Sequence, residues 1–297
     1  MNNTKKKSPI SWVPTAYFAM GLPFVVLNMV TVLMFKGLEV DDKLITFWTS
    51  LILLPWTLKP LWSPFLELFR TKKFFVIVTQ LITGVTFGLV AFALNLSHFF
   101  SISIALLAIV AFSGATHDIA CDGVYMSELS NEDQAKFIGW QGAFYNIAKI
   151  LATGGLVYLA GYFIELNADA GLLIANKRAW MIILLILSVT MILLGIYHLF
   201  ALPSTQSASS KKTLRSNKEV MKELGQVLMD FFRKTHITYY IFFIILYRFA
   251  EGFVMKIVPL FLKADREMGG LGLNEKEIGL YYGTYGAAAF VLGSLLA

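Results

Sequence analysis

Long apolar runs separated by short polar connections dominate this 297-residue chain. A helix that spans a bilayer needs about 20 mostly apolar residues, whereas a membrane strand needs only about 9–11. The runs have the length of helices, so the pattern predicts an all-α membrane protein rather than a barrel. The eight predicted spans cover approximately residues 11–35, 46–66, 74–94, 101–125, 136–164, 179–202, 237–262 and 277–297.

The overall composition agrees with this pattern. Hydrophobic residues make up 57% of the chain and charged residues 15%, whereas soluble domains carry about 25% charged residues. The formal net charge of +6 comes from basic residues in short loops, a distribution that sets membrane orientation. We therefore expect a lipid bilayer and no nucleic acid as a partner. The one cysteine, Cys121, excludes an internal disulfide bond.

The basic residues of the loops predict the orientation in the membrane. If the N-terminus is cytoplasmic, 14 lysines and arginines fall on the inside, 7 on the outside and 4 within spans, which accounts for all 25. Loops rich in lysine and arginine stay in the cytoplasm. The N-terminus, with Lys5, Lys6 and Lys7, is therefore predicted to be cytoplasmic.

The spacing of the spans predicts three regions. Residues 1–202 hold six spans with short connections, as in a six-helix bundle. Residues 203–236 form a cytoplasmic linker that begins with a flexible composition. The spacing of its apolar residues fits an amphipathic helix on the membrane surface and fits a solvated linker helix equally well. Residues 237–297 then form spans seven and eight, the start of a second six-helix bundle.

A short internal echo supports two bundles. The segment G-L-E-V-D-D-K-L-I-T-F-W at 37–48 has the same order of apolar and polar types as G-L-G-L-N-E-K-E-I-G-L-Y at 270–281. Parallel repeats of six spans build the two halves of major-facilitator transporters. On this basis we expect the chain, which stops inside an apolar run, to be C-terminally truncated and to hold eight of an expected twelve membrane helices.

Polar and ionisable residues inside the spans are the candidate functional residues, because a charge at membrane depth is costly and usually marks a pathway or a binding site. Asp118 and Asp122 lie one helical turn apart in span four and therefore share a face. His117 lies on the neighbouring stripe. The other candidates are Asn28 in span one, Lys59 in span two, Gln141, Tyr145 and Lys149 in span five, and Arg248, Glu251 and Lys256 in span seven.

Each candidate also has a structural interpretation. The aspartates could pair with Lys59 and Lys149 only to hold helices together. Arg248 and Glu251 lie three residues apart and could neutralise each other. Lys256 lies nearer the outer end of its span and could extend to the membrane surface. A lone histidine such as His117 is more often a packed hydrogen-bonding residue than a relay.

Four motifs resemble the AmpG-like muropeptide permeases, which belong to the peptide/acetyl-coenzyme A transporter family of the major facilitator superfamily. They are Y-F-A-M-G-L-P-F at 17–24, L-P-W-T-L-K-P-L-W-S-P at 54–64, A-T-H-D-I-A-C-D at 115–122 and L-Y-R-F-A-E-G-F-V-M-K-I-V-P-L-F-L at 246–262. The resemblance implies a major facilitator fold of two six-helix bundles around a central cavity. It also implies proton-linked uptake of anhydro-muropeptides across the bacterial inner membrane. By motif match, the functional positions that the resemblance implies in this chain are Lys59, Asp118 and Asp122.

The sequence therefore predicts a secondary transporter and not an enzyme, with no cofactor and no metal. Protons and an anionic solute, such as a glycopeptide, are the expected partners. Asp118 and Asp122 are the candidates for proton coupling, because two carboxylates in a low-dielectric cavity repel unless one is neutral or paired with a lysine. Substrate binding is assigned to Lys59, Lys149, Gln141, Tyr145 and Asn28, with Arg248, Glu251 and His117 as secondary candidates.

Two rival functions fit the same residues. The first is an intramembrane, metal-dependent, lipid-modifying enzyme that uses Asp118 and Asp122. Such a site needs further carboxylates on a facing helix, and the candidates there are lysines. The second is a sensor or scaffold that does not transport. The chain contains no nucleotide-binding fingerprint, so it encodes no ATP-driven step.

Overall fold

The computed structural model describes residues 7–63, 71–203 and 232–289, together with residues 66, 222, 225, 226, 229 and 230. Helices account for all the regular structure in these ranges, as predicted. Six of them are long and apolar enough to cross a membrane, and they match the first six predicted spans. They cover Pro9–Gly37, Asp42–Leu61, Lys72–Ala93, Phe99–Glu128, Asn131–Leu166 and Leu172–Ala201.

The first span is one continuous helical segment that changes its winding in the middle. A five-residue π-helical turn begins three residues after Pro23, and such turns occur frequently at functional sites. Asn28 is the middle residue of this turn. The components are η1 (Pro9–Ser11), α1 (Val13–Val25), η2 (Val26–Val30) and α2 (Thr31–Gly37).

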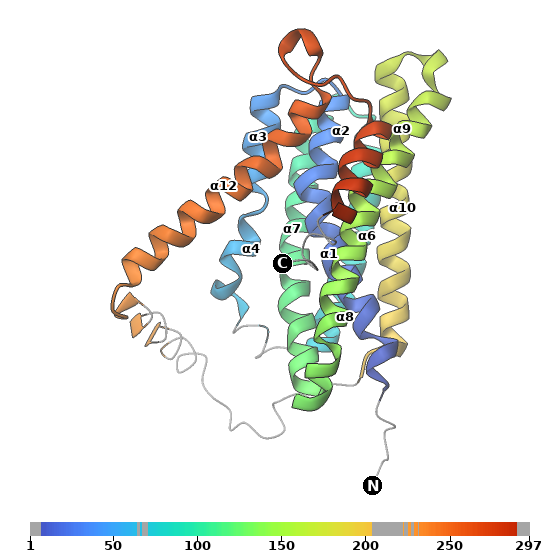
Figure 1. The fold of residues 1–297 in the computed structure, drawn as a ribbon. Helices are drawn as coiled ribbons and strands as arrows, with labels where there is room; N and C mark the ends of the chain where they lie inside the picture. Colours follow the sequence, from blue (N-terminus) through green and yellow to red (C-terminus); the bar gives the residue numbers. More distant parts are fainter. Residues whose placement is uncertain are drawn as a thin grey trace.

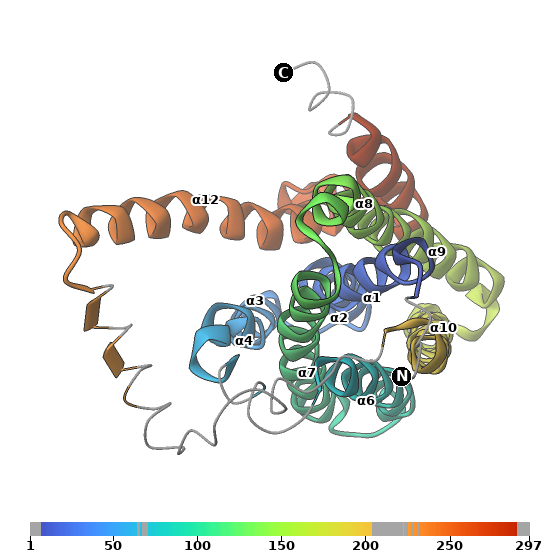
Figure 2. The same cartoon turned by 90° about the horizontal axis from the view of Figure 1, so that it is seen from below.

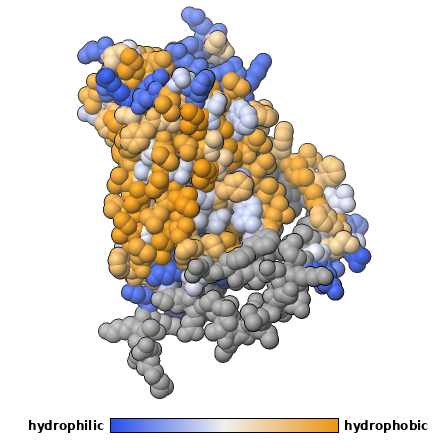
Figure 3. All heavy atoms as spheres, turned by 180° about the vertical axis from the view of Figure 1, so that it is seen from behind, coloured by the Kyte–Doolittle hydropathy of each residue, from blue (hydrophilic) through white to orange (hydrophobic). Residues whose placement is uncertain are grey.

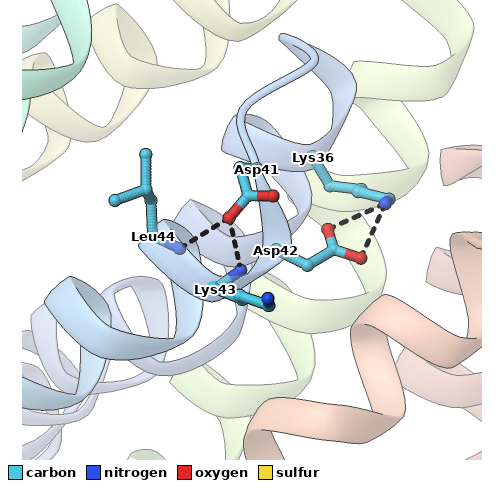
Figure 4. A network of polar contacts seen from close by, with 5 residues as sticks. All are labelled: Lys36, Asp41, Asp42, Lys43 and Leu44. Atoms are coloured by element: carbon cyan, nitrogen blue, oxygen red, sulfur yellow. Dashed lines mark hydrogen bonds and ion pairs between the residues drawn. The ribbon is translucent and has the colours of Figure 1, made fainter.

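The second span starts at Asp42, four residues before the predicted position. The carboxylate of Asp41 caps the helix by accepting from the amides of Lys43 (3.0 Å) and Leu44 (3.2 Å), and Lys36 donates to Asp42 at 2.7 Å (Figure 4). These polar contacts begin the helix ahead of its apolar run. Prolines then divide the span into α3 (Asp42–Leu51), α4 (Leu54–Leu58) and the 3₁₀ turn η3 (Lys59–Leu61).

The remaining spans of the first bundle are α6 (Lys72–Ala93), α7 (Phe99–Glu128), the fifth span and α10 (Leu172–Ala201). Lys177 and Arg178, predicted to lie in an outer loop, belong to the first turns of α10. Lysine and arginine are good helix formers, so the helix extends beyond the apolar run that predicted it. The fifth span consists of α8 (Asn131–Ile150), the π-helical turn η4 (Leu151–Leu156) and α9 (Val157–Leu166).

Close helix packing builds the first bundle. Helix α6 lies between α7 and α10, and α1 packs along α8 (Figures 1 and 2). Gly84 on α6 allows the approach of α10, because a Cβ there would lie 2.9 Å from the carbonyl oxygen of Ser188. Apolar side chains cover much of the face in Figure 3, with hydrophilic residues towards its ends. That distribution fits a bundle set across a bilayer.

The part of the chain after the predicted linker, from residue 237 on, is called the second region below; it contributes α12 (Ile237–Lys263), η7 (Arg266–Met268), α13 (Glu275–Ile278) and the π-helical η8 (Gly279–Gly286). The later part of α12 contacts α2, η2 and α3, and its beginning diverges from the bundle (Figures 1 and 2). Leu260 and Ile278 join the same buried apolar cluster as the first bundle. Most of the predicted linker helix lies outside the described residues, and the boundaries 1–202, 203–236 and 237–297 stay predictions.

The internal echo has the same local conformation in both copies. Glu39 and Gly272 occupy equivalent positions and both have left-handed backbones, with φ of 61° and 64°. Asp41 and Asn274, two residues later in each copy, cap the helix that follows. Shared capping and shared turn geometry support our interpretation of the echo as a structural repeat.

Candidate functional site

Asp118 on α7 forms the centre of the candidate site. Its Oδ2 atom accepts a hydrogen bond from Lys59 Nζ at 2.6 Å and another from Trp56 Nε1 at 2.9 Å. The residue is 8% exposed, and its Oδ1 atom is buried with no hydrogen-bond partner among the described residues. One carboxylate oxygen is therefore fully engaged, and the other is open to a proton or a ligand.

Local sequence explains how the three side chains meet. Gly114 lies one turn before Asp118, and a Cβ there would come within 2.8 Å of the Trp56 ring. The missing side chain lets the indole lie against α7. Lys59 begins the 3₁₀ turn that follows α4, so the second span ends its regular helix where the lysine meets α7. Trp56 was not predicted, although it lies in the same motif as Lys59.

Asp122 has a different partner from Asp118. Its Oδ1 accepts from the hydroxyl of Tyr17 on α1 at 2.8 Å, and the Tyr17 ring packs edge-on against Tyr125 with centroids 5.9 Å apart. Tyr17 was also not predicted. The two aspartates share a face of α7, as expected, yet one is ion-paired and the other is hydrogen-bonded to a phenol.

This arrangement can bind and release a proton. A carboxylate held by a lysine can exchange that partner for a proton when another anion competes for the ammonium group. A metal would need several carboxylate, histidine or cysteine ligands. Asp118 faces a cation and an indole instead, and the described part of the chain has no group of three such ligands.

His117 belongs to a buried polar network that links four helices. Gln80 on α6 contacts both His117 Nε2 (2.9 Å) and His198 Nδ1 on α10 (2.8 Å). His198 Nε2 in turn lies 2.9 Å from the hydroxyl of Thr15 on α1. Because an amide nitrogen only donates and an amide oxygen only accepts, Gln80 donates to His117 Nε2 and keeps that imidazole neutral, and it accepts from His198 Nδ1, which must carry a hydrogen. His117 thus takes part in hydrogen bonding between helices, and its assignment as a secondary candidate stays a prediction.

Replacing Gln80 with methionine should destabilise the protein. The change leaves a buried nitrogen of each histidine without its partner, which costs about 1–3 kcal/mol per group. A lower thermal midpoint of the detergent-purified protein would show this. Ile82→Met on the same helix is the control, since Ile82 is 41% exposed. Equal midpoints for the two variants would contradict the network.

The other predicted binding residues lie on α8 and η2. Gln141, Tyr145 and Lys149 are half-buried along α8, the helix that packs on α1. The Asn28 side chain is buried and donates to the carbonyl oxygen of Phe24 at 3.0 Å. The side chains of Arg248 and Glu251 lie outside the described residues, and all of these assignments stay predictions.

Lys256 does not extend to the membrane surface as its position suggested. It is 5% exposed, and its ammonium group donates to the backbone oxygens of Asn28 (3.2 Å) and Thr49 (3.3 Å). These oxygens belong to the first and second spans. A buried cation of α12 therefore connects the second region to the first bundle.

Glycines also bring the second region close to the first bundle, at a contact between the fifth and eighth spans. A Cβ on Gly283 would lie 2.2 Å from the carbonyl oxygen of Thr153, and one on Gly154 would lie 2.6 Å from the Thr284 hydroxyl. Lys276 adds an ion pair with Glu165 at 2.9 Å. Only glycines allow the π-helical turns η4 and η8 to approach this closely.

An apolar cavity of about 520 Å³ lies between the second span and α7. Trp48, Leu51, Leu58, Phe100, Ile104 and Phe112 are among its lining residues, none of which is charged. Asp118 and Lys59 are not part of its wall, so the cavity is separate from the carboxylate site.

Comparisons with known proteins agree on the fold. A sequence profile described as Major Facilitator Superfamily matches residues 15–297. No curated protein matches the chain. A crystal structure of a bacterial homolog of the human lysosomal transporter Spinster, in an inward-facing and unoccupied conformation, is 14% identical with a TM-score of 0.69. The match covers 99% of this chain and 62% of that one, so the chain spans less than two thirds of the length of that transporter.

Proposed function

Because the chain belongs to the major facilitator superfamily, a group of multi-pass membrane proteins, we propose that the protein is a proton-coupled secondary transporter of anionic solutes. Anhydro-muropeptides are the substrates that the sequence motifs favour. The observation that carries the proposal is the Lys59–Asp118 pair, a buried carboxylate and a lysine that meet at 2.6 Å from two different spans.

The pair provides a route to coupling. A substrate carboxylate that reaches Lys59 competes with Asp118 for the ammonium group. Asp118 then remains in a low-dielectric site without a counter-charge, and taking up a proton removes that cost. Substrate and proton thus bind together, as symport requires. Trp56 keeps the carboxyl group in place in both states, because its indole donates to the same oxygen.

The arrangement of the two regions supports alternating access, in which one bundle moves against the other around a central site. They meet near the end of the bundle where α2 leads into α3, through Lys256, Lys276 and the glycine contacts. The first turns of α12 diverge from the bundle at the opposite end (Figure 1). We assign this arrangement to the state that is closed at the α2–α3 end.

Uptake into proteoliposomes tests the function. The full-length protein should concentrate a radiolabelled anhydro-muropeptide when a proton gradient is imposed, and should stop when the gradient is collapsed. Turnover of a lipid substrate in detergent, lost when a chelator removes the metal, would favour the enzyme alternative. Absence of flux for every tested anion, together with a stably bound protein partner, would favour the sensor or scaffold.

Orientation and location are part of the proposal. We place the protein in the bacterial inner membrane with its N-terminus in the cytoplasm, on the basis of the loop charges. Labelling of a single introduced cysteine by a membrane-impermeant reagent tests this. A cysteine in the α2–α3 connection should react from outside the cell, and one near residue 7 should not.

A further inference from the structure

Lys256 is the buried cation that the proposed mechanism leaves without a role. Its two acceptors are neutral backbone oxygens, and no carboxylate pairs with it among the described residues. Other lysines of the second region have acidic partners, since Lys263 pairs with Glu275 and Lys276 pairs with Glu165. A desolvated ammonium held only by carbonyl oxygens remains a strong site for an anion.

Both hydrogen bonds of Lys256 join the second region to the first bundle. Asn28 supplies its oxygen from the π-helical turn of the first span, and Thr49 supplies its oxygen from α3. If the regions separate at the α2–α3 end, as alternating access requires, both bonds must break. The ammonium group then loses its acceptors just as that end opens.

We propose that Lys256 is a switch residue that binds backbone oxygens in the closed state and the anionic group of the substrate in the state open at the α2–α3 end. The proposal deepens the transport function above, on which it rests, and gives the protein a second cation for substrate recognition. Lys59 binds from the first bundle and is neutralised by Asp118 in this state, whereas Lys256 acts from the second region.

Charge selectivity of binding tests the anion role. The probes are an anhydro-muropeptide with free peptide carboxylates and the same compound with these groups amidated, titrated into the full-length protein in detergent. Wild type should prefer the carboxylate form by about tenfold or more, a difference of about 1.4 kcal/mol. Lys256→Met should lose most of this preference, with Lys59 responsible for the remainder, and Lys256→Arg should keep it. Lys43→Met, which changes an exposed lysine of α3, is the control.

A distance measurement without any substrate tests whether the hydrogen bonds of Lys256 hold the two regions together. Spin labels on Leu44 of α3 and Met268 of η7, which are 47% and 82% exposed, report the separation of the two regions at this end. Lys256→Met should shift the distribution towards longer distances in the unliganded protein. An unchanged distribution would overturn the proposed role of Lys256 in the closed state.

The outcomes separate this inference from the proposed function. Retained carboxylate preference in Lys256→Met overturns the anion role while muropeptide transport stands. If wild type binds no muropeptide, the proposed substrate is wrong, and thermal stabilisation by acetate against acetamide becomes the probe. Stabilisation by acetate that disappears in Lys256→Met would support the anion site. Equal stabilisation of both proteins, or none in either, would overturn it.

Discussion

The Asp118→Asn variant should carry its substrate only down the concentration gradient. Asparagine keeps an oxygen for Trp56 and Lys59 but cannot take up a proton at this position, so the coupling free energy between proton and substrate is lost. Accumulation driven by a proton gradient should fall to the equilibrium level, whereas exchange of substrate across the membrane should continue. Proteoliposome uptake with and without the gradient measures both.

Asp122→Asn distinguishes the two carboxylates. The amide oxygen can still accept from Tyr17, so the variant removes protonation and retains the hydrogen bond. We expect it to lose accumulation as well; retained accumulation would assign coupling to Asp118 alone. Wild-type accumulation in both asparagine variants would make the aspartates structural residues and would refute the coupling mechanism.

Lys59→Met tests the ion pair itself. Removing one member of a buried pair leaves an uncompensated charge and costs about 3–5 kcal/mol, and the additional Asp118→Asn change should restore most of the lost thermal stability. The matched control is Lys36→Met, alone and with Asp42→Asn. The carboxylate of that pair is far more exposed, since the Asp42 side chain is 45% accessible and the Asp118 side chain 11%, and such pairs contribute only about 0–1 kcal/mol.

The Gly283→Leu variant should fail to close at the α2–α3 end and should lose most of its transport. Its side chain would meet the Thr153 carbonyl oxygen, where even a Cβ would lie at 2.2 Å. Backbone cannot move aside as a side-chain rotamer does, so the helices must separate. Overpacking of this kind costs at least about 1–3 kcal/mol. Uptake rates and the thermal midpoint report the two effects.

Gly142→Leu provides the control for this helix-packing prediction. No atom of the described residues lies within 4 Å of a Cβ built on Gly142, so this variant should retain transport and stability. A Gly283→Leu protein that transports as well as Gly142→Leu would show that close contact between η4 and η8 is not required in the transport cycle.

Much of the fold followed from the sequence alone because lipid imposes a simple rule on length and polarity. The first six spans are present, and the largest errors lie at their starts. The charged start of α10 and the Asp41 cap of α3 extend helices beyond the apolar runs. A hydropathy pattern detects the part of a helix that lies in the bilayer but does not detect its polar ends.

The candidate site was predicted in part. Helical periodicity placed Asp118 and Asp122 on one face, since a four-residue spacing determines that face within one helix. The membrane depth of Lys59 made it a candidate partner for an aspartate. Periodicity gives no information on which neighbouring helix a side chain meets, and so Trp56, Tyr17 and the Gln80 network were missed.

The sequence by itself thus determined the helices, their apolar faces and the polar residues at membrane depth. The tertiary structure decided the partners: Lys59 for Asp118, Tyr17 for Asp122, and two backbone oxygens for Lys256. The physical reason is that a local pattern constrains rotation and polarity within one helix. Contacts between helices depend on their relative depth, tilt and rotation, which the packing of the whole bundle sets.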